Sequence, residues 1–211
     1  MAEVDELTQA LRRARDGDEA GFATVYRTVQ PRLLRYLRVF LAGDPDPTAA
    51  AEDVAAEAWL QIVRDLGGFK GDGEDFRAWA ATVARNRAMD HHRRAACRPR
   101  SAEIEVEDLT LVADDDVSEQ ALARLGTDRA IALLGTLPPD QAEAIVLRVV
   151  LGLDANASAK VLGKKPGAVR MAAHRGLANL ADRLAADEAA ETAALHSPVT
   201  DSSPDALKVV R

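Results

Sequence analysis

One stretch of the sequence, residues 76–94 (FRAWAATVARNRAMDHHRR), carries most of the side chains that could do chemistry. Its Asp90, His91 and His92 could bind a metal ion, its arginines could bind nucleic acid, or the stretch could be an ordinary solvated helix face. A metal site is the weakest of the three. Adjacent residues on a helix point about 100° apart, and the chain has only four histidines. We therefore expect no metal ion and no cofactor.

The sequence offers no convincing catalytic site either. The single cysteine, Cys97, lies at the edge of a predicted linker and has no evident base nearby. The glycine-rich turn GGFKGDGED (67–75) lacks the spacing of a phosphate-binding loop. Neither nucleophilic catalysis nor nucleotide hydrolysis is expected.

Nucleic-acid binding fits the same stretch better. Phe76, Trp79, Ala80 and Val83 recur at helical spacing and would anchor a helix to a core. Beyond them come donors for phosphates and an amide that could read a base edge: Arg85, Asn86, Arg87, Arg93 and Arg94. A base read by such an edge would be unstacked and single-stranded. Taken alone, these residues indicate a helical domain with a basic edge.

A second basic region lies in a predicted helix-turn-helix. A proline-started helix (139–151) is followed by a good N-cap, Asp154, and a good helix stop, Gly163, before a last helix near Pro166. One sector of that last helix is apolar: Val169, Ala173, Gly176, Leu177 and Leu180. The opposite sector could read a major groove: Arg170, Met171, His174 and Arg175. A solvated helix face is the alternative, but the capped helix and glycine turn favour DNA binding.

Charge divides the chain, whose formal net charge is -7. Residues 76–100 hold seven arginines and one acid, 101–120 hold eight acids and no Lys or Arg, and 160–183 hold six basic residues and one acid. An acidic segment therefore separates two basic ones. Because it lacks a sustained helical period, we predict an acidic linker at 97–118.

Composition predicts an all-α protein. Hydrophobic residues make up 47% of the chain but aromatic residues only 4%, and alanine, the best helix former, is frequent. We expect a helical bundle in 1–96, a helix-turn-helix domain in 119–186 and a disordered tail in 187–211. No segment approaches the roughly 20 apolar residues of a membrane span. The acidic start and the lone cysteine predict a cytoplasmic protein that does not insert into a membrane.

Three motifs in this order resemble one family with high specificity. They are F-R-A-W…A-R-N-R-A-x-D-H-x-R-R, then L-P-P-x-Q, then G-x-V-R-x-x-x-H-R. The chain is similar over about 7–95 and 119–185 to the bacterial extracytoplasmic-function (ECF) RNA polymerase sigma factors. The resemblance implies that 1–96 is sigma region 2, which binds core polymerase and melts the minus-ten element. It implies that 119–186 is sigma region 4, which reads the minus-thirty-five element.

The resemblance also implies roles for particular residues. Asp53 and Glu57, with Trp59 behind them, match the helix that docks on the clamp coiled coil of core RNA polymerase. Residues 84–87 match a short loop that captures a flipped base of the non-template strand, which places Arg85, Asn86 and Arg87 at the minus-ten element; Arg93 and Arg94 match backbone-contacting positions. The minus-thirty-five set is Lys165, Arg170, Met171, His174 and Arg175. Two positions depart from the family: Ala56 replaces a usual Gln, and Ser158 replaces a usual Ile.

The expected function is therefore that of an alternative sigma factor and not of an enzyme. Core RNA polymerase and promoter DNA, both duplex and single-stranded, are the implied partners, and the resemblance admits an anti-sigma protein. We also expect the free protein to be largely autoinhibited for DNA binding, because net acidity and domain packing can hide the basic segments. The alternative is a stand-alone helix-turn-helix regulator of duplex operators, which would leave the edge at 85–87 without a purpose. An interaction adaptor would leave both basic segments unexplained.

Overall fold

The computed structural model describes residues 2–97 and 128–195, and all of its regular structure in these ranges is helical. The prediction of an all-α fold in two helical units is thus confirmed. The predicted acidic linker, 97–118, falls almost entirely outside the described residues. No helix in the described ranges is long and apolar enough to cross a membrane.

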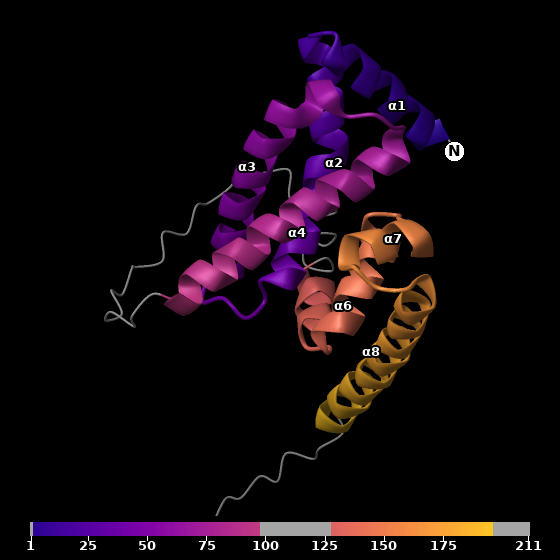
Figure 1. Cartoon of the computed structure of the whole chain (residues 1–211). Helices are drawn as coiled ribbons and strands as arrows, with labels where there is room; N and C mark the ends of the chain where they lie inside the picture. Colours follow the sequence, from indigo (N-terminus) through magenta and orange to yellow (C-terminus); the bar gives the residue numbers. More distant parts are fainter. Residues whose placement is uncertain (1, 98–127, 196–211) are drawn as a thin grey trace, which may run out of the picture.

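The N-terminal unit is a bundle of four helices (Figure 1). They are α1 (Ala2–Arg15), α2 (Glu19–Phe40), α3 (Pro47–Asp65) and α4 (Gly73–Cys97), with a short turn η1 (Leu66–Gly68) after α3. Side chains of Asp18, Asp46 and Asp72 accept hydrogen bonds from the first backbone amides of α2, α3 and α4. Each of these helices therefore begins where a capping aspartate satisfies its free amides.

The core of this unit follows the apolar period of α2. Val25, Val29, Leu33 and Leu37 are spaced by four residues and are fully buried. Gly21 permits close packing of α1 on α2, because a Cβ at this position would lie 2.7 Å from the Cβ of Arg13. On α3, by contrast, the apolar Val63 is 53% exposed.

The C-terminal unit begins with helical residues 128–135. It continues with α6 (Pro139–Ile145), a short π-helix η2 (Val146–Val150), α7 (Ala155–Leu162) and α8 (Pro166–Leu195). The predicted caps of α7 are confirmed. Asp154 accepts from the Ala157 amide at 2.6 Å, and Gly163 ends the helix with φ 64°. The helix-turn-helix outline therefore rests on local chemistry that can be recognised in the sequence.

Helix α8 is longer than expected. It runs to Leu195, so the prediction of a disordered tail from residue 187 does not hold for 187–195, and residues 196–211 lie outside the described part. The Ala-rich sequence after Leu184 explains the continuation, since alanine is the best helix former. Figure 1 shows α8 extending away from the N-terminal bundle.

The two units are in contact. Helix α7 packs against α4, and α6 and η2 pack against α2. Helix α4 is therefore covered on one side by its own bundle and on another by the C-terminal unit. This arrangement decides which of its basic residues are free.

Candidate nucleic-acid interface

The basic edge of the N-terminal unit lies on one continuous helix. Residues 84–87 were expected to form a short loop, but they lie in the middle of α4. The reason is that no Gly or Pro follows Gly73 within α4, while Ala84 and Ala88 are fully buried against the bundle. The base-reading candidates are thus held by a rigid element.

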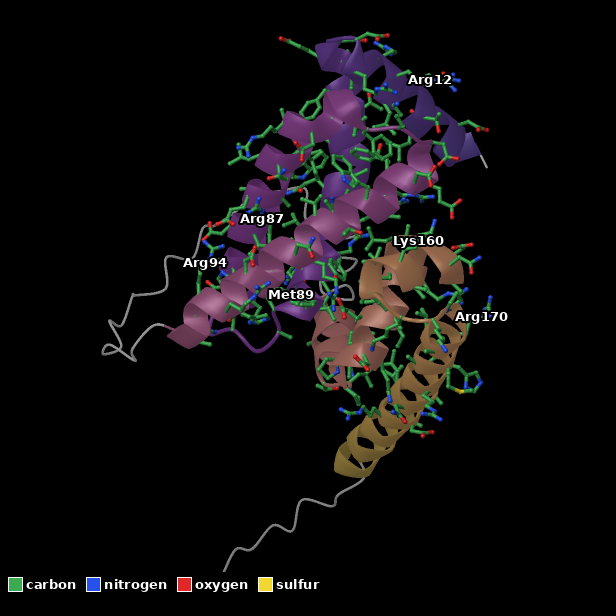
Figure 2. All side chains as sticks on the ribbon, viewed as in Figure 1. Arg12, Arg87, Met89, Arg94, Lys160 and Arg170 are labelled. Carbon is green, nitrogen blue, oxygen red and sulfur yellow. The ribbon has the colours of Figure 1, made fainter. Side chains whose placement is uncertain are left out.

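Three of the five residues on this edge are exposed, and Arg85 and Arg87 are half-buried. Asn86 is exposed, and the side chains of Arg93 and Arg94 are 71% and 59% exposed. Arg87 is half-buried and donates to Gln61 of α3 at 2.8 Å. Figure 2 shows Arg87 and Arg94 on the same side of the molecule. These groups can reach a phosphate backbone without rearrangement of the fold.

Arg85 behaves differently, because the C-terminal unit covers it. Its Nε donates to Oε1 of Glu143 on α6 at 2.7 Å, and its side chain is 21% exposed. Its guanidinium also lies 5.8 Å from the ring centre of Phe40. Sequence reasoning placed Arg85 with its neighbours, whereas the structure separates it from them.

The candidate polymerase-docking residues lie on α3. Asp53 is exposed and Glu57 is half-exposed, on the same face as the exposed Ala56. Trp59 lies behind them, 6% exposed, and its Nε1 donates to Oε1 of Gln30. Trp59 therefore supports this face from the core and does not form part of its surface.

One apolar residue belongs to this face and was missed by sequence reasoning. Leu60 is 69% exposed and follows Asp53, Ala56 and Glu57 at helical spacing. A single exposed leucine is common on a protein surface, but its spacing places this one beside the acidic residues. Its position outside the buried stripe of Val54, Ala58 and Ile62 was the signal that could have identified it.

The acidic face of α3 and the basic edge of α4 are joined by an ion pair. Arg94 Nη2 lies 3.0 Å from Oε2 of Glu57. The hydrogen bond from Arg94, together with its positive charge, lowers the pKa of Glu57 against a smaller opposing effect of burial. A residue predicted to contact polymerase and one predicted to contact DNA are therefore each other's partners in this structure.

The second candidate surface is the exposed side of α8. All five predicted residues are exposed: Lys165, Arg170, Met171, His174 and Arg175. Val169, Ala173 and Gly176 on the opposite side are buried, while Leu177, predicted to be apolar core, is 48% exposed. Figure 2 shows Arg170 on the opposite side of the molecule from Arg87 and Arg94. The two candidate surfaces are separate.

The histidine pair at the end of the first stretch has other partners than a metal ion. His91 Nε2 lies 3.2 Å from Oδ2 of Asp44. The ring of His92 packs on Phe40, with centroids 5.6 Å apart. In the ranges that the structure describes, no cluster of three or more His, Cys, Asp or Glu side chains could hold a metal ion.

Comparison with known proteins gives a consistent result. The family model of sigma-70 region 2 matches residues 25–97, and that of sigma-70 region 4 matches residues 127–180. The ECF RNA polymerase sigma factor ShbA of Streptomyces griseus is 35% identical over 181 residues, which are 84% of this chain and 95% of that protein. The ECF RNA polymerase sigma factor SigD of Mycobacterium tuberculosis is 32% identical over 182 residues, 86% of this chain and 85% of that protein.

Among solved structures, CnrH in complex with the cytosolic domain of CnrY has a TM-score of 0.59 at 24% identity. The match covers 87% of this chain and 99% of that one. This likeness concerns the fold.

Proposed function

Since the chain belongs to the family of ECF RNA polymerase sigma factors, we propose that it directs core RNA polymerase to its promoters by melting a minus-ten element and reading a minus-thirty-five element. The polymerase carries out the synthesis, and this chain supplies promoter choice and strand opening. Residues 1–96 are the melting unit in this proposal, 119–186 the upstream-reading unit, and 97–118 an acidic linker between them.

The observation that carries the proposal is the pair of exposed basic surfaces on two separately matched units. On α4, Asn86 can offer its amide to an unstacked base while Arg87, Arg93 and Arg94 neutralise phosphates. Flipping a base costs a few kcal/mol of unstacking, which such contacts must offset. Arg85 completes this set once it leaves Glu143.

On α8, the exposed side has the composition of a major-groove reader. Arg170 and Arg175 can donate two hydrogen bonds to a guanine, and His174 can donate one. Met171 offers an apolar contact, and Lys165 lies at the turn, where a phosphate contact would fix the position of the helix. The buried Val169 and Ala173 hold the opposite side against the unit.

Core polymerase would dock on α3. Asp53 and Glu57 supply negative charge, Leu60 supplies apolar area, and Trp59 keeps the helix in place from behind. The exposed Ala56 lies between the two acids, so its difference from the family's usual Gln affects the contact surface and leaves the core unchanged. We extend the proposal to an anti-sigma protein, because the related fold of CnrH is known with the cytosolic domain of CnrY bound.

A stand-alone regulator of duplex operators is the less favoured function. It would use α8 alone and would require no homologue of a promoter-melting unit. The match of sigma-70 region 2 to residues 25–97 argues against it.

The decisive experiment is transcript-start sequencing on fragmented genomic DNA of the source organism, with purified core polymerase in the presence and absence of this protein. New start sites that share a two-part upstream motif are expected. If a competent core polymerase gives no new starts, the proposal fails and the regulator of duplex operators takes its place.

A further inference from the structure

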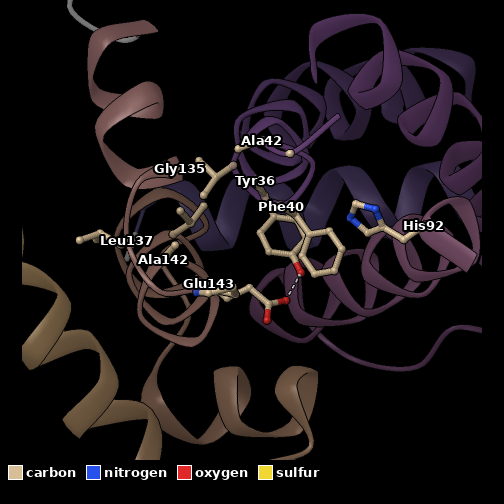
Figure 3. A pocket seen from close by; sticks show the side chains of 12 residues that line it. Tyr36, Phe40, Ala42, His92, Gly135, Leu137, Ala142 and Glu143 are labelled. Atoms are coloured by element: carbon tan, nitrogen blue, oxygen red, sulfur yellow. Dashed lines mark hydrogen bonds between the residues drawn. The ribbon is translucent and has the colours of Figure 1, made fainter. Parts of the chain in front are cut away.

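A buried carboxylate joins the two units at the position where Arg85 is covered. Glu143 of α6 is 8% exposed. Its Oε1 accepts from the hydroxyl of Tyr36 on α2 and from Nε of Arg85 on α4, both at 2.7 Å. Figure 3 shows the Tyr36 hydroxyl directed at the Glu143 carboxylate across the boundary between the units. One side chain of the C-terminal unit thus bonds two helices of the N-terminal unit.

These bonds depend on one another. Burial and the negative charge of Glu143 raise the pKa of Tyr36 well above its ordinary value. The hydroxyl therefore stays protonated and donates a hydrogen bond to the carboxylate. A buried carboxylate needs a cationic partner, and Arg85 is that partner. If Arg85 left while the units stayed together, Glu143 would remain buried without its cation. Release of Arg85 and separation of the units are therefore coupled.

The same boundary has two imperfections that a permanent interface would avoid. Arg77 of α4 is 7% exposed, and its Nε has no hydrogen-bond partner within the described ranges. It faces the C-terminal unit, since a Cβ at Gly152 would lie 3.3 Å from its Nη1. A cavity of about 270 Å³ also lies beside the carboxylate, lined by Tyr36, Phe40, His92 and Glu143 among others (Figure 3). A buried N–H group without an acceptor and an unfilled volume both weaken association.

We propose that Glu143 is a latch: with Tyr36 it holds the free protein closed, and it withholds Arg85 from single-stranded DNA until the two units separate. This rests on the proposed function, in which Arg85 belongs to the minus-ten set. The carboxylate acts as an internal competitor of the DNA phosphates for the Arg85 guanidinium. The unsatisfied Nε–H group of Arg77 and the cavity keep the closed state weak enough to be opened by binding of core polymerase.

The first test changes the charge of the latch and needs no knowledge of the promoter. Glu143→Gln keeps the size of the side chain and removes its negative charge. Asp128→Asn is the matched control, because Asp128 also forms an ion pair across the boundary, with Arg38 at 2.9 Å, but it is 53% exposed. Radius of gyration by small-angle scattering and affinity for a fluorescein-labelled oligothymidylate are measured on the full chain.

Glu143→Gln is expected to increase the radius of gyration and to strengthen oligothymidylate binding. If the closed state is about ten times more populated than the open one, full opening strengthens apparent affinity by about tenfold. Asp128→Asn is expected to change neither quantity measurably. Unchanged values for Glu143→Gln, or equal effects of the two variants, would overturn the proposal.

The second test locks the boundary. A Cβ at Gly135 would lie 2.9 Å from the Cβ of Ala42, about 0.9 Å short of the roughly 3.8 Å of a disulfide, so the two segments must move slightly apart to accept the bond. The chain with Ala42→Cys, Gly135→Cys and Cys97→Ser is oxidised, and the cross-link is verified by mass spectrometry. The oxidised protein should bind oligothymidylate more weakly than the reduced protein and should not initiate transcription with core polymerase, and reductant should restore both.

The outcomes separate the latch from the proposed function. A cross-linked protein that binds DNA and transcribes normally overturns the latch. If both the reduced protein and the native chain fail to initiate transcription, the proposed function is overturned. The scattering measurement on Glu143→Gln would still test the latch in that case.

Discussion

Replacing Ser158 by alanine is expected to stabilise the helix-turn-helix unit. Ser158 is fully buried in α7, and its Oγ has no hydrogen-bond partner among the described residues. A buried hydroxyl without a partner costs about 1–3 kcal/mol of desolvation. Alanine also exceeds serine in helix propensity by roughly 0.5 kcal/mol. The small void left by one oxygen atom offsets part of this gain, so a net stabilisation of about 1–2 kcal/mol is expected.

Amide hydrogen exchange of the full chain measures this change locally. The amides of Val161 and Leu162 in α7 should exchange about 5–30-fold more slowly in Ser158→Ala, the factor that corresponds to 1–2 kcal/mol. Lys160→Ala is the control, because Lys160 is exposed on the same helix and its replacement changes helix propensity by a few tenths of a kcal/mol at most. Exchange in Ser158→Ala that is equal to or faster than in the native chain would refute the reasoning, since it would mean that the hydroxyl is satisfied.

Three further predictions concern the ends and faces of the helices. The hydrogen bond from the Ala157 amide is the main cause that lowers the pKa of Asp154 below its ordinary 3.8, so the cap stabilises α7 above that value and is lost as pH falls through the lowered pKa. The urea midpoint should therefore fall with acid in the native chain and fall less in Asp154→Asn; identical pH profiles would contradict this. Asn86→Ala should reduce strand opening, measured by permanganate reactivity, more than co-purification with core polymerase, and equal losses would remove Asn86 from the base-reading site. Arg175→Ala should weaken holoenzyme binding to the upstream duplex by about 1–3 kcal/mol, and an unchanged affinity in a gel-shift titration would place Arg175 outside that contact.

Features set by neighbours in the sequence were predicted well. The N-cap at Asp154 and the stop at Gly163 depend on side chains and backbone within a few residues, and both are present. The exposed face of α8 followed from its own period. The π-helix at Val146–Val150 was not predicted, because the apolar run that contains it is interrupted by Arg148 alone and has no period that could reveal a change of helix type.

Features set by contacts between distant segments were not predictable. A helical period assigns one buried face to α4, but this helix packs on two sides, and the second side buries Arg77 and covers Arg85. The partner of Arg85, Glu143, is 58 residues away and belongs to the other unit. Nothing in the local sequence distinguishes Arg85 from the exposed Arg93.

The pair of Glu57 and Arg94 has a thermodynamic consequence. In the free protein each of these side chains satisfies the other, and in the proposed initiation complex each has a different partner, polymerase for Glu57 and a promoter phosphate for Arg94. The first of the two partners to bind must break the ion pair, and the second partner then binds without that cost. The two binding equilibria are therefore linked. Linkage is reciprocal. If bound polymerase raises the affinity for promoter DNA by some factor through this pair, bound promoter DNA raises the affinity for polymerase by the same factor. Because the pair is exposed, this factor should shrink as salt concentration rises.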